Sequence, residues 1–242
     1  LPVLAVLLAI LALWYAGAVF MNWTTAGERL LREMPEAGVI DRVAATLSDQ
    51  RPLLPAPHQI AAEIWNTTVG VRPTSPRSLL FHAQVTLSST LLGFVLGTLL
   101  GMALAIGILH SRTLEKSLMP WIIASQTIPI LAIAPIVIVV LGSIGLKGLV
   151  PKALISAYLC FFPVAIGMVK GLASPDPMQL DLLRTYNAGT VQTLIKLRWP
   201  ASVPFLFASL KVAVAISLVG AIVAELPTGA QAGLGARLLA GS

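Results

Sequence analysis

The chain has 242 residues, of which 57% are hydrophobic and 11% are charged, and its formal net charge is +6. Soluble domains usually carry about a quarter charged residues, so this composition excludes an ordinary soluble domain and favours a protein that lies in lipid. The basic residues are scattered without a basic run, which argues against nucleic-acid binding. The single cysteine, Cys160, excludes a disulfide within the chain, and the three histidines are too far apart in the sequence to indicate a metal site.

Five apolar segments are long enough to span a bilayer, which takes about 20 residues in a helix. They are residues 1–23, 83–109, 118–146, 153–169 with a possible extension from 149, and 204–227, which Lys211 interrupts. Lipid offers no hydrogen-bond partner to the backbone, and the alternating pattern of a membrane barrel is absent. The sequence therefore predicts an all-α polytopic membrane bundle. The first segment lacks the basic front of a signal peptide, and we expect further residues before Leu1.

The distribution of cations predicts the orientation, because cytoplasmic loops carry an excess of Lys and Arg. Residues 110–117 and 170–200 together hold six such residues, and the opposing loop 142–152 holds two. This places 110–117 and 170–200 in the cytoplasm. By parity, residues 24–82 form an extracytoplasmic loop, where two stretches with helical apolar spacing predict short surface helices.

The second apolar segment carries glycines at a spacing of four, Gly93, Gly97 and Gly101. Such glycines line one face of a helix and allow a neighbouring helix to approach closely. We interpret them as helix-packing residues.

The third apolar segment contains Pro129 and Pro135, which kink a helix and free backbone carbonyls. Three polar residues, Ser125, Gln126 and Thr127, precede the first kink. Two interpretations stay open for these polar residues and Pro129: hydrogen bonding between helices, or the lining of a path for a solute.

Glu225 follows Lys211 by fourteen residues in the fifth segment, which is about 21 Å along a helix. If Lys211 marks the inner edge of a hydrocarbon core about 30 Å thick, Glu225 still lies inside it. An intramembrane carboxylate is a functional candidate, so Glu225 is a candidate for the solute path near an outer gate. The alternative is a helix cap or a salt bridge at the outer interface.

Residues 173–200 form a long insertion between two spanning segments. Pro177 to Tyr186 has the spacing of an amphipathic helix, with Leu180 and Leu183 near one face. Asn187, Ala188 and Gly189 predict a turn, since Asn and Gly tolerate the left-handed backbone that ends a helix. The helical pattern then resumes from Val191 to Trp199. Such an insertion either docks a soluble partner or simply connects two spanning helices.

This insertion resembles the EAA loop of binding-protein-dependent ABC importer permeases, a motif with Glu-Ala-Ala, a Gly six residues after the Glu and a Pro thirteen residues later. With Pro200 as the anchor, Asp181 takes the Glu position and Asn187 the Gly position. Leu182 and Leu183 replace the two alanines, and Gln192 falls where Gln is common. The resemblance implies contact with an ATPase through Leu180, Asp181, Leu182, Leu183, Arg184, Thr185, Tyr186, Asn187, Ala188, Gly189, Gln192 and Pro200.

Three further stretches resemble the same family in the right order: LLPAPHQI at 53–60, TIPILAIAPIVIVVLGSIG at 127–145 and IVAELPTGAQAGLG at 222–235. They are most similar to the branch of nitrate, sulfonate, taurine and pyrimidine-precursor permeases. The resemblance implies a MetI-like bundle with a first transmembrane helix at 1–23, an extracytoplasmic loop at 24–82 and a permease core at 83–242 with its coupling loop at 173–200. A sixth spanning helix is expected beyond Ser242.

The same resemblance implies an ATP-driven importer of the bacterial inner membrane. Two permease copies, as a homodimer, would surround the path of a small polar solute, a sulfonate, nitrate or a pyrimidine. Two cytoplasmic ATPase subunits would bind ATP and Mg, and an extracytoplasmic binding protein would deliver the solute.

No nucleotide or catalytic motif occurs in the chain. The string GSIGLKG at 142–148 fails the spacing of a phosphate-binding loop, and no metalloprotease or Gly-x-Ser-x-Gly motif is found. We therefore expect ATP hydrolysis in a partner and no enzymatic activity here. Two other classes stay open: a secondary transporter or channel without an ATPase, which more often shows an acid–base relay or inverted repeats, and a membrane anchor or sensor subunit.

Overall fold

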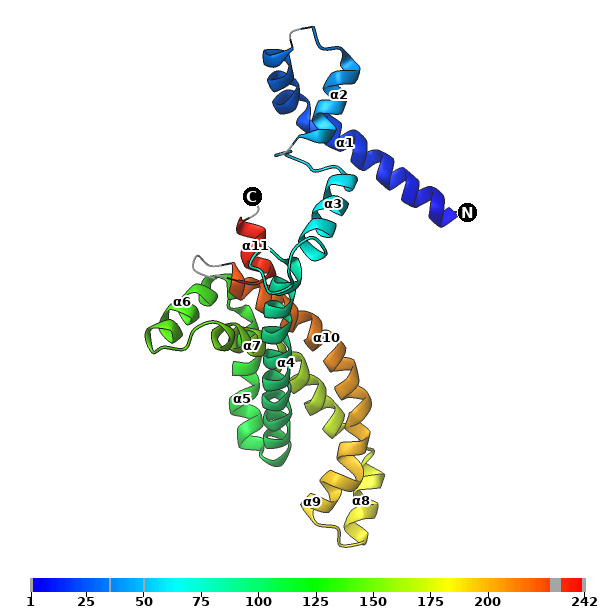
Figure 1. Ribbon diagram of the computed structural model, residues 1–242. Coiled ribbons are helices and arrows are strands. Elements are labelled where there is room, and N and C mark those ends of the chain that lie inside the picture. Colours follow the sequence, from blue (N-terminus) through cyan, green and yellow to red (C-terminus); the bar gives the residue numbers. More distant parts are fainter. Residues whose placement is uncertain (1, 35, 50, 227–231, 241–242) are drawn as a thin grey trace. The chain divides into compact units, whose positions relative to one another are not determined.

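The computed structural model describes residues 2–34, 36–49, 51–226 and 232–240, and every regular element in this part of the chain is helical (Figure 1). The predicted all-α membrane bundle is confirmed. The helices are α1 Pro2–Glu33, α2 Val39–Ser48, α3 Pro57–Thr68, α4 Leu79–His110, α5 Arg112–Ala124, α6 Ile130–Ser143, α7 Leu149–Ala173, α8 Pro177–Thr185, α9 Thr190–Thr193, α10 Trp199–Glu225 and α11 Leu234–Ala240. A 3-10 turn covers Ser125–Thr127, and a π-helical turn covers Leu194–Arg198.

The chain divides into two compact units, residues 1–79 and 80–242, and each is described by itself. Among the described residues, four helices are long and apolar enough to cross a membrane: Pro2–Arg32, Leu79–His110, Leu149–Ala173 and the continuous helix Thr190–Glu225. Each is longer than its apolar run, because a helix continues through polar residues until a breaker or a cap ends it. A fifth crossing is counted only if α5 and α6 form one broken span.

The segment 118–146, predicted as one helix kinked by its prolines, is divided at Pro129 into α5 and α6, which can still form one broken span. The chain bends by 99° between the α5 segment and α6. Ile128 adopts an extended backbone, with φ −81° and ψ 121°, because the ring of Pro129 disfavours the helical conformation of the residue before it. Helix α5 also begins earlier than expected, at Arg112, where the Ser111 hydroxyl accepts a hydrogen bond from the Leu114 N–H.

Helix α7 packs closely against α4 through the three spaced glycines. A Cβ atom on Gly97 would lie 2.2 Å from Cys160 Sγ and 2.7 Å from the Ala157 carbonyl oxygen. Equivalent atoms on Gly93 and Gly101 would lie 2.4 to 2.9 Å from α7. No side chain fits in this space, so the two backbones approach as only glycine permits.

Helix α10 runs antiparallel to α7 on a second contact face. Gly171 lies against Ser202, and Gly167 lies so close to Ser209 that neither glycine has room for a Cβ atom. Farther along, the Ser156 hydroxyl donates to the carbonyl of Ser217, and the Ser217 hydroxyl donates to the carbonyl of Thr90 on α4. These buried hydroxyl groups link α4, α7 and α10 at membrane depth, where each polar group needs a protein partner.

In the first unit, α1 extends to Glu33, ten residues beyond the predicted 1–23. The buried Asn22 side chain explains why the following chain folds back on this helix. Its amide oxygen accepts from the N–H groups of Leu53 and Leu54, and its amide nitrogen donates to the Leu54 carbonyl. The LLPAPHQI stretch is thereby attached to α1.

The two short helices α2 and α3 lie where apolar spacing predicts surface helices. Gln59 begins α3 by accepting a hydrogen bond from the Ala56 N–H at 2.8 Å, while its amide donates to the Asp49 carbonyl at 3.0 Å. Arg42 of α2 lies 4.9 Å from the ring centroid of Trp23 on α1, a cation–π contact.

Candidate functional site

The segment between α7 and α10 is organised by local caps. Asp176 begins α8, since its carboxylate accepts from the Met178 N–H at 2.8 Å, and Gln179 accepts in return from the Asp176 N–H at 3.3 Å. Gln192 does the same for α9 by accepting from the Gly189 N–H at 3.1 Å. The cap of α8 is reciprocal and that of α9 has the glutamine bond alone, and both satisfy backbone groups that a helix start leaves open. The Gln192 side chain therefore has a structural role in this conformation.

The turn between α8 and α9 depends on Asn187. Its φ of 55° is the only positive value among the described non-glycine residues. Asn is one of the few residues that visit this left-handed region readily, and its N–H donates to the Arg184 carbonyl at 2.9 Å. The structure thus gives Asn187 the backbone conformation that the sequence indicated for the Gly position of the motif.

Helix α8 presents an exposed apolar face. Met178 and Tyr186 are 78% and 75% exposed, and Leu182 between them is 56% exposed. Leu180 and Leu183, on which the predicted amphipathic face was based, are instead partly buried. The apolar face continues across the turn to Val191 and Ile195.

Two charged residues of the motif pair with each other beside this face. Arg184 Nη1 lies 2.9 Å from Asp181 Oδ1, and both side chains are exposed. An exposed ion pair of this kind contributes about 0–1 kcal/mol to stability. Asp181 and Arg184 are therefore available to a partner at little cost to the fold.

The segment 177–198, predicted from the sequence as the coupling segment, joins α10 without a break. Residues 190–225 form one continuous helix, into which the π-helical turn is inserted. Arg198 fixes the start of α10 to the end of α7, since its Nη1 donates to the Leu172 carbonyl at 2.7 Å. Pro200 follows the π-helical turn directly, where the helical hydrogen-bond pattern is already altered, so the helix continues past a residue that has no N–H. The turn is therefore connected to a membrane-spanning helix without an intervening loop.

At the other end of α10, Glu225 is completely buried and paired. Lys152 Nζ at the start of α7 lies 3.2 Å from Glu225 Oε1. The Thr86 hydroxyl of α4 donates to Glu225 Oε2 at 2.8 Å, and the Gly235 N–H donates to the same oxygen at 3.0 Å. Of the two interpretations of Glu225, this geometry matches the cap and salt bridge, and the carboxylate faces protein donors in this conformation.

The same cluster explains the Gly-Leu-Gly string at 233–235. A Cβ on Gly233 would lie 2.0 Å from the Glu225 carboxyl carbon, and Gly233 has a φ of +126°. A Cβ on Gly235 would lie 2.5 Å from the Ile222 carbonyl oxygen. His82 Nδ1 accepts from the Gly233 N–H at 3.0 Å, and the Lys152 ammonium donates to the Ala232 carbonyl.

Sequence reasoning missed the partners of Glu225. Thr86 and Lys152 lie 139 and 73 residues away in the chain, and nothing in the sequence pairs them with a residue on α10. A weak signal existed for Lys152, because a lysine so near the start of an apolar run needs a counter-charge when it is buried.

The polar residues before Pro129 bond within their own segment. The Ser125 hydroxyl donates to the Ile122 carbonyl and the Thr127 hydroxyl to the Ala124 carbonyl, each at 2.7 Å. Gln126, Thr127 and Pro129 are exposed in the single subunit. One bond between helices is present, in which Tyr158 of α7 donates to the Ser125 carbonyl. The break between α5 and α6 is thus held by α7.

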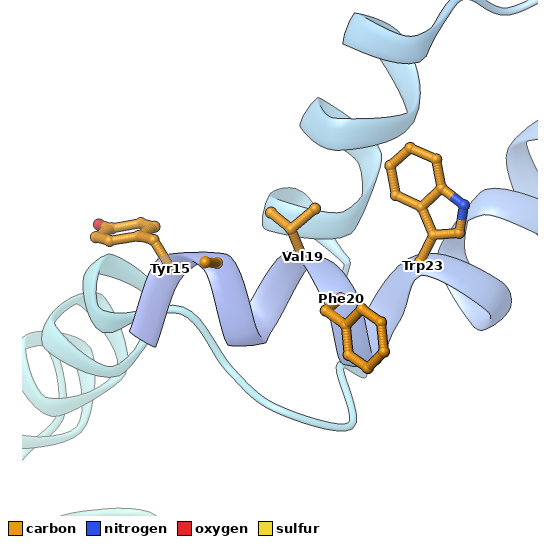
Figure 2. A pocket seen from close by; sticks show the side chains of 5 residues that line it. Tyr15, Val19, Phe20 and Trp23 are labelled. Atoms are coloured by element: carbon orange, nitrogen blue, oxygen red, sulfur yellow. The ribbon is translucent and has the colours of Figure 1, made fainter. Parts of the chain in front are cut away.

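The first unit carries an apolar hollow of about 630 Å³ along α1, lined by Tyr15, Ala16, Val19, Phe20 and Trp23 (Figure 2). Tyr15 is fixed there by a contact of 3.1 Å between its hydroxyl and His58 Nδ1. The lining has no charged side chain, and α1 has the length and hydropathy of a spanning helix. This surface suits lipid acyl chains rather than a polar solute.

Comparison with known proteins decides the family. Residues 97–242, more than half of the chain, match the family of binding-protein-dependent transport system inner membrane components. The chain belongs to this family of ABC importer permeases. The permease is therefore a multi-pass protein of the bacterial inner membrane. It is not itself an enzyme, because ATP is hydrolysed by a partner subunit in this family.

Similar curated proteins agree with this assignment. The permease is 33% identical to a probable ABC transporter permease protein of Haemophilus influenzae, over 86% of this chain and 81% of the relative. It is 31% identical to the formylaminopyrimidine transport permease of Halalkalibacterium halodurans, over 81% and 74%. It is 32% identical to the riboflavin transport system permease of Chloroflexus aurantiacus, over 76% and 65%. Sulfonate and nitrate permeases are among the further relatives, which matches the predicted branch.

Proposed function

We propose that the permease couples to a separate ATPase through residues 177–200 and forms the path of a small polar solute. The observation that carries this proposal is the exposed apolar face of α8, on a segment that continues into a membrane-spanning helix. Solvent-exposed Met178, Leu182 and Tyr186 are costly to leave in water unless a partner covers them. The charge distribution predicts that this face lies in the cytoplasm.

The mechanism follows from the continuity of the helix. Two permease copies would enclose the path, with two ATPase subunits that bind ATP and Mg at the coupling segments. Closure of the ATPase pair displaces α8 and the turn, and the rod from Thr190 to Glu225 carries this movement across the bilayer. The path then alternates between inward and outward opening, because the coupling segment makes different contacts in the two states.

The relatives support a solute of a sulfonate, nitrate or pyrimidine type. One relative is named for formylaminopyrimidine and another for riboflavin. In an importer of this kind, an extracytoplasmic binding protein selects the solute. A thermal-shift screen of that binding protein with sulfonates, nitrate and pyrimidines would identify it, and a shift with none of these ligands would contradict the proposed class.

The coupling assignment is tested with Leu182→Asp in the complex of permease and ATPase. The added charge opposes burial of the apolar face, so solute uptake should fall at least about tenfold while ATP hydrolysis no longer responds to the binding protein. Ile64→Asp is the matched control, since Ile64 is an exposed apolar residue on the short helix α3 of the other unit. Unchanged uptake in Leu182→Asp would contradict the coupling role.

A secondary transporter or channel remains the competing function. It would transport without an ATPase, so uptake by the permease alone in proteoliposomes would favour it. In its favour is the buried ion pair of Lys152 and Glu225, the only ion pair within the described membrane-spanning helices.

A further inference from the structure

A polar hollow of about 290 Å³ lies where α4 ends, between its last turn and the coupling segment. Its lining includes Leu109 and His110 from α4, Leu180 and Arg184 from α8, and Thr190 and Arg198 beyond the turn. The volume is at the lower end of the range of ligand pockets, about 300–1,000 Å³. The hollow therefore has room for a small charged group.

The charges of this hollow favour an anion. Arg184, Arg198 and His110 all line it, and none of its described lining residues is acidic. Arg184 forms an ion pair with a carboxylate outside the hollow, since its Nη1 lies 2.9 Å from Asp181 Oδ1. Arg198 contacts an uncharged group, because its Nη1 donates to the Leu172 carbonyl.

Arg184, Arg198 and His110 are each held by one nitrogen and have others available. Arg198 and Arg184 each use Nη1, and a guanidinium carries five N–H donors in a rigid fork. His110 Nδ1 lies 2.7 Å from the Ile106 carbonyl, which only accepts, so this nitrogen carries the proton and Nε2 is directed elsewhere. Side chains positioned in advance lose less freedom when they bind a phosphate in a forked geometry.

The hollow is also at the depth of lipid headgroups. Helix α4 has 32 residues, which is about 48 Å, comparable to a bilayer of about 40–45 Å with its headgroups. Its last residue, His110, therefore lies at the membrane surface. Basic pockets between spanning helices at this depth bind anionic headgroups.

We propose that this hollow binds a phosphate group through Arg184, Arg198 and His110, delivered by an anionic phospholipid or as soluble phosphate. The bound group contacts the coupling segment on the side of Leu180 and Arg184, while Leu182 and Tyr186 stay exposed on the other side. The phosphate would thus join the end of α4 to the coupling segment. The site does not require an ATPase, so it can be tested independently of the proposed coupling role, with which it shares Arg184.

The test uses the purified full chain without ATPase, in mixed micelles of phosphatidylglycerol or phosphatidylcholine, with retained lipid measured by mass spectrometry after gel filtration. Arg184→Gln and His110→Gln should each retain about fivefold less phosphatidylglycerol than the unaltered chain. Lys196→Gln is the matched control, because Lys196 is an exposed cation of the same segment that does not line the hollow. Arg198 is left unchanged because it anchors α10 to α7.

Adding inorganic phosphate identifies the source of the group. Loss of bound phosphatidylglycerol with added phosphate assigns the site to soluble phosphate, and retention assigns it to the lipid headgroup. The proposal would be overturned if the unaltered chain and all three variants retained equal amounts of phosphatidylglycerol. It would also be overturned if Lys196→Gln lost as much of this lipid as Arg184→Gln and His110→Gln. Because the assay contains no ATPase, a failure of the coupling assignment leaves its result unchanged.

Discussion

The ammonium of Lys152 lies 3.2 Å from a carboxylate oxygen of Glu225, and both side chains are buried where α7 begins and α10 ends. Removing one member of a buried ion pair is strongly destabilising, by about 3–5 kcal/mol, because the other charge is left without a partner. Glu225 also accepts from Thr86 and from the Gly235 backbone, so its oxygens serve the ion pair and the cap together.

The first prediction concerns this pair. Glu225→Gln should lower the thermal stability of the purified permease in detergent, since the neutral amide leaves the Lys152 charge unbalanced. Adding Lys152→Met should recover part of the loss, because the amide oxygen introduced by Glu225→Gln still offers an acceptor to Thr86 and Gly235. A double variant whose loss equals or exceeds the sum of the two single losses would contradict the ion-pair explanation.

The recovered double variant also separates stability from transport. If Glu225 borders the path near the outer gate, uptake should stay low even though the fold is restored. Normal uptake and normal stimulation of the ATPase would restrict Glu225 to its structural role.

The second prediction concerns Gly233. Gly233→Ala should destabilise the permease by about 2–4 kcal/mol, because its Cβ meets the Glu225 carboxylate and its φ of +126° is strained for any other residue. Gly142→Ala on α6 is the control, since nothing lies within 4 Å of its added Cβ. Equal melting temperatures for the two variants would show that the close contact at Gly233 relaxes without cost.

The third prediction concerns the contact of α4 with α7. Gly97→Ala should lower the melting temperature, at a cost of about 1–3 kcal/mol, by forcing the two helices apart. Cys160→Ala should not fully rescue it, because the Ala157 backbone oxygen remains 2.7 Å from the new atom. In Gly107→Ala the nearest contact is an ordinary 3.7 Å from Leu114, so this control should be neutral or slightly stabilising. Full rescue by Cys160→Ala would place the strain in the sulfur contact alone.

The fourth prediction concerns the turn at Asn187. Asn187→Gly should preserve uptake, because glycine adopts a φ of 55° without strain. Asn187→Val should reduce uptake in the assembled importer, since a β-branched residue in this conformation costs about 1–2 kcal/mol and shifts α8. The ratio of solute transported to ATP hydrolysed measures the effect. Equal ratios for Val and Gly would mean that the turn does not set the position of α8.

The sequence predicts the apolar cores of the spanning helices well and their ends poorly. Hydropathy reports which residues contact lipid, and it located α4, α7 and α10 within a few residues of their apolar portions. It does not report where a helix stops. The polar end of α1 at Glu33 and the helical residues from Thr190 that precede the apolar part of α10 both lie outside the apolar runs.

The break at Pro129 shows a second limit. A proline in an apolar run predicts a bend, but its angle depends on what holds the two halves. Here Tyr158 of α7 bonds the Ser125 carbonyl beside the break, a contact set by tertiary packing. The partners of Glu225 were hidden for the same reason, whereas the left-handed turn at Asn187 was predictable because it depends on local backbone chemistry alone.

The π-helical turn at 194–198 has a geometric consequence for the whole subunit. The Trp199 N–H donates to the Leu194 carbonyl, five residues back, so this turn holds one residue more than an α-helical turn. Deleting a single residue here would restore an ordinary helix, yet it would swivel α8 and its turn by about 100° around the α10 axis. The direction that α8 faces around the α10 axis, and with it the proposed contact with the ATPase, is thus set by one extra residue.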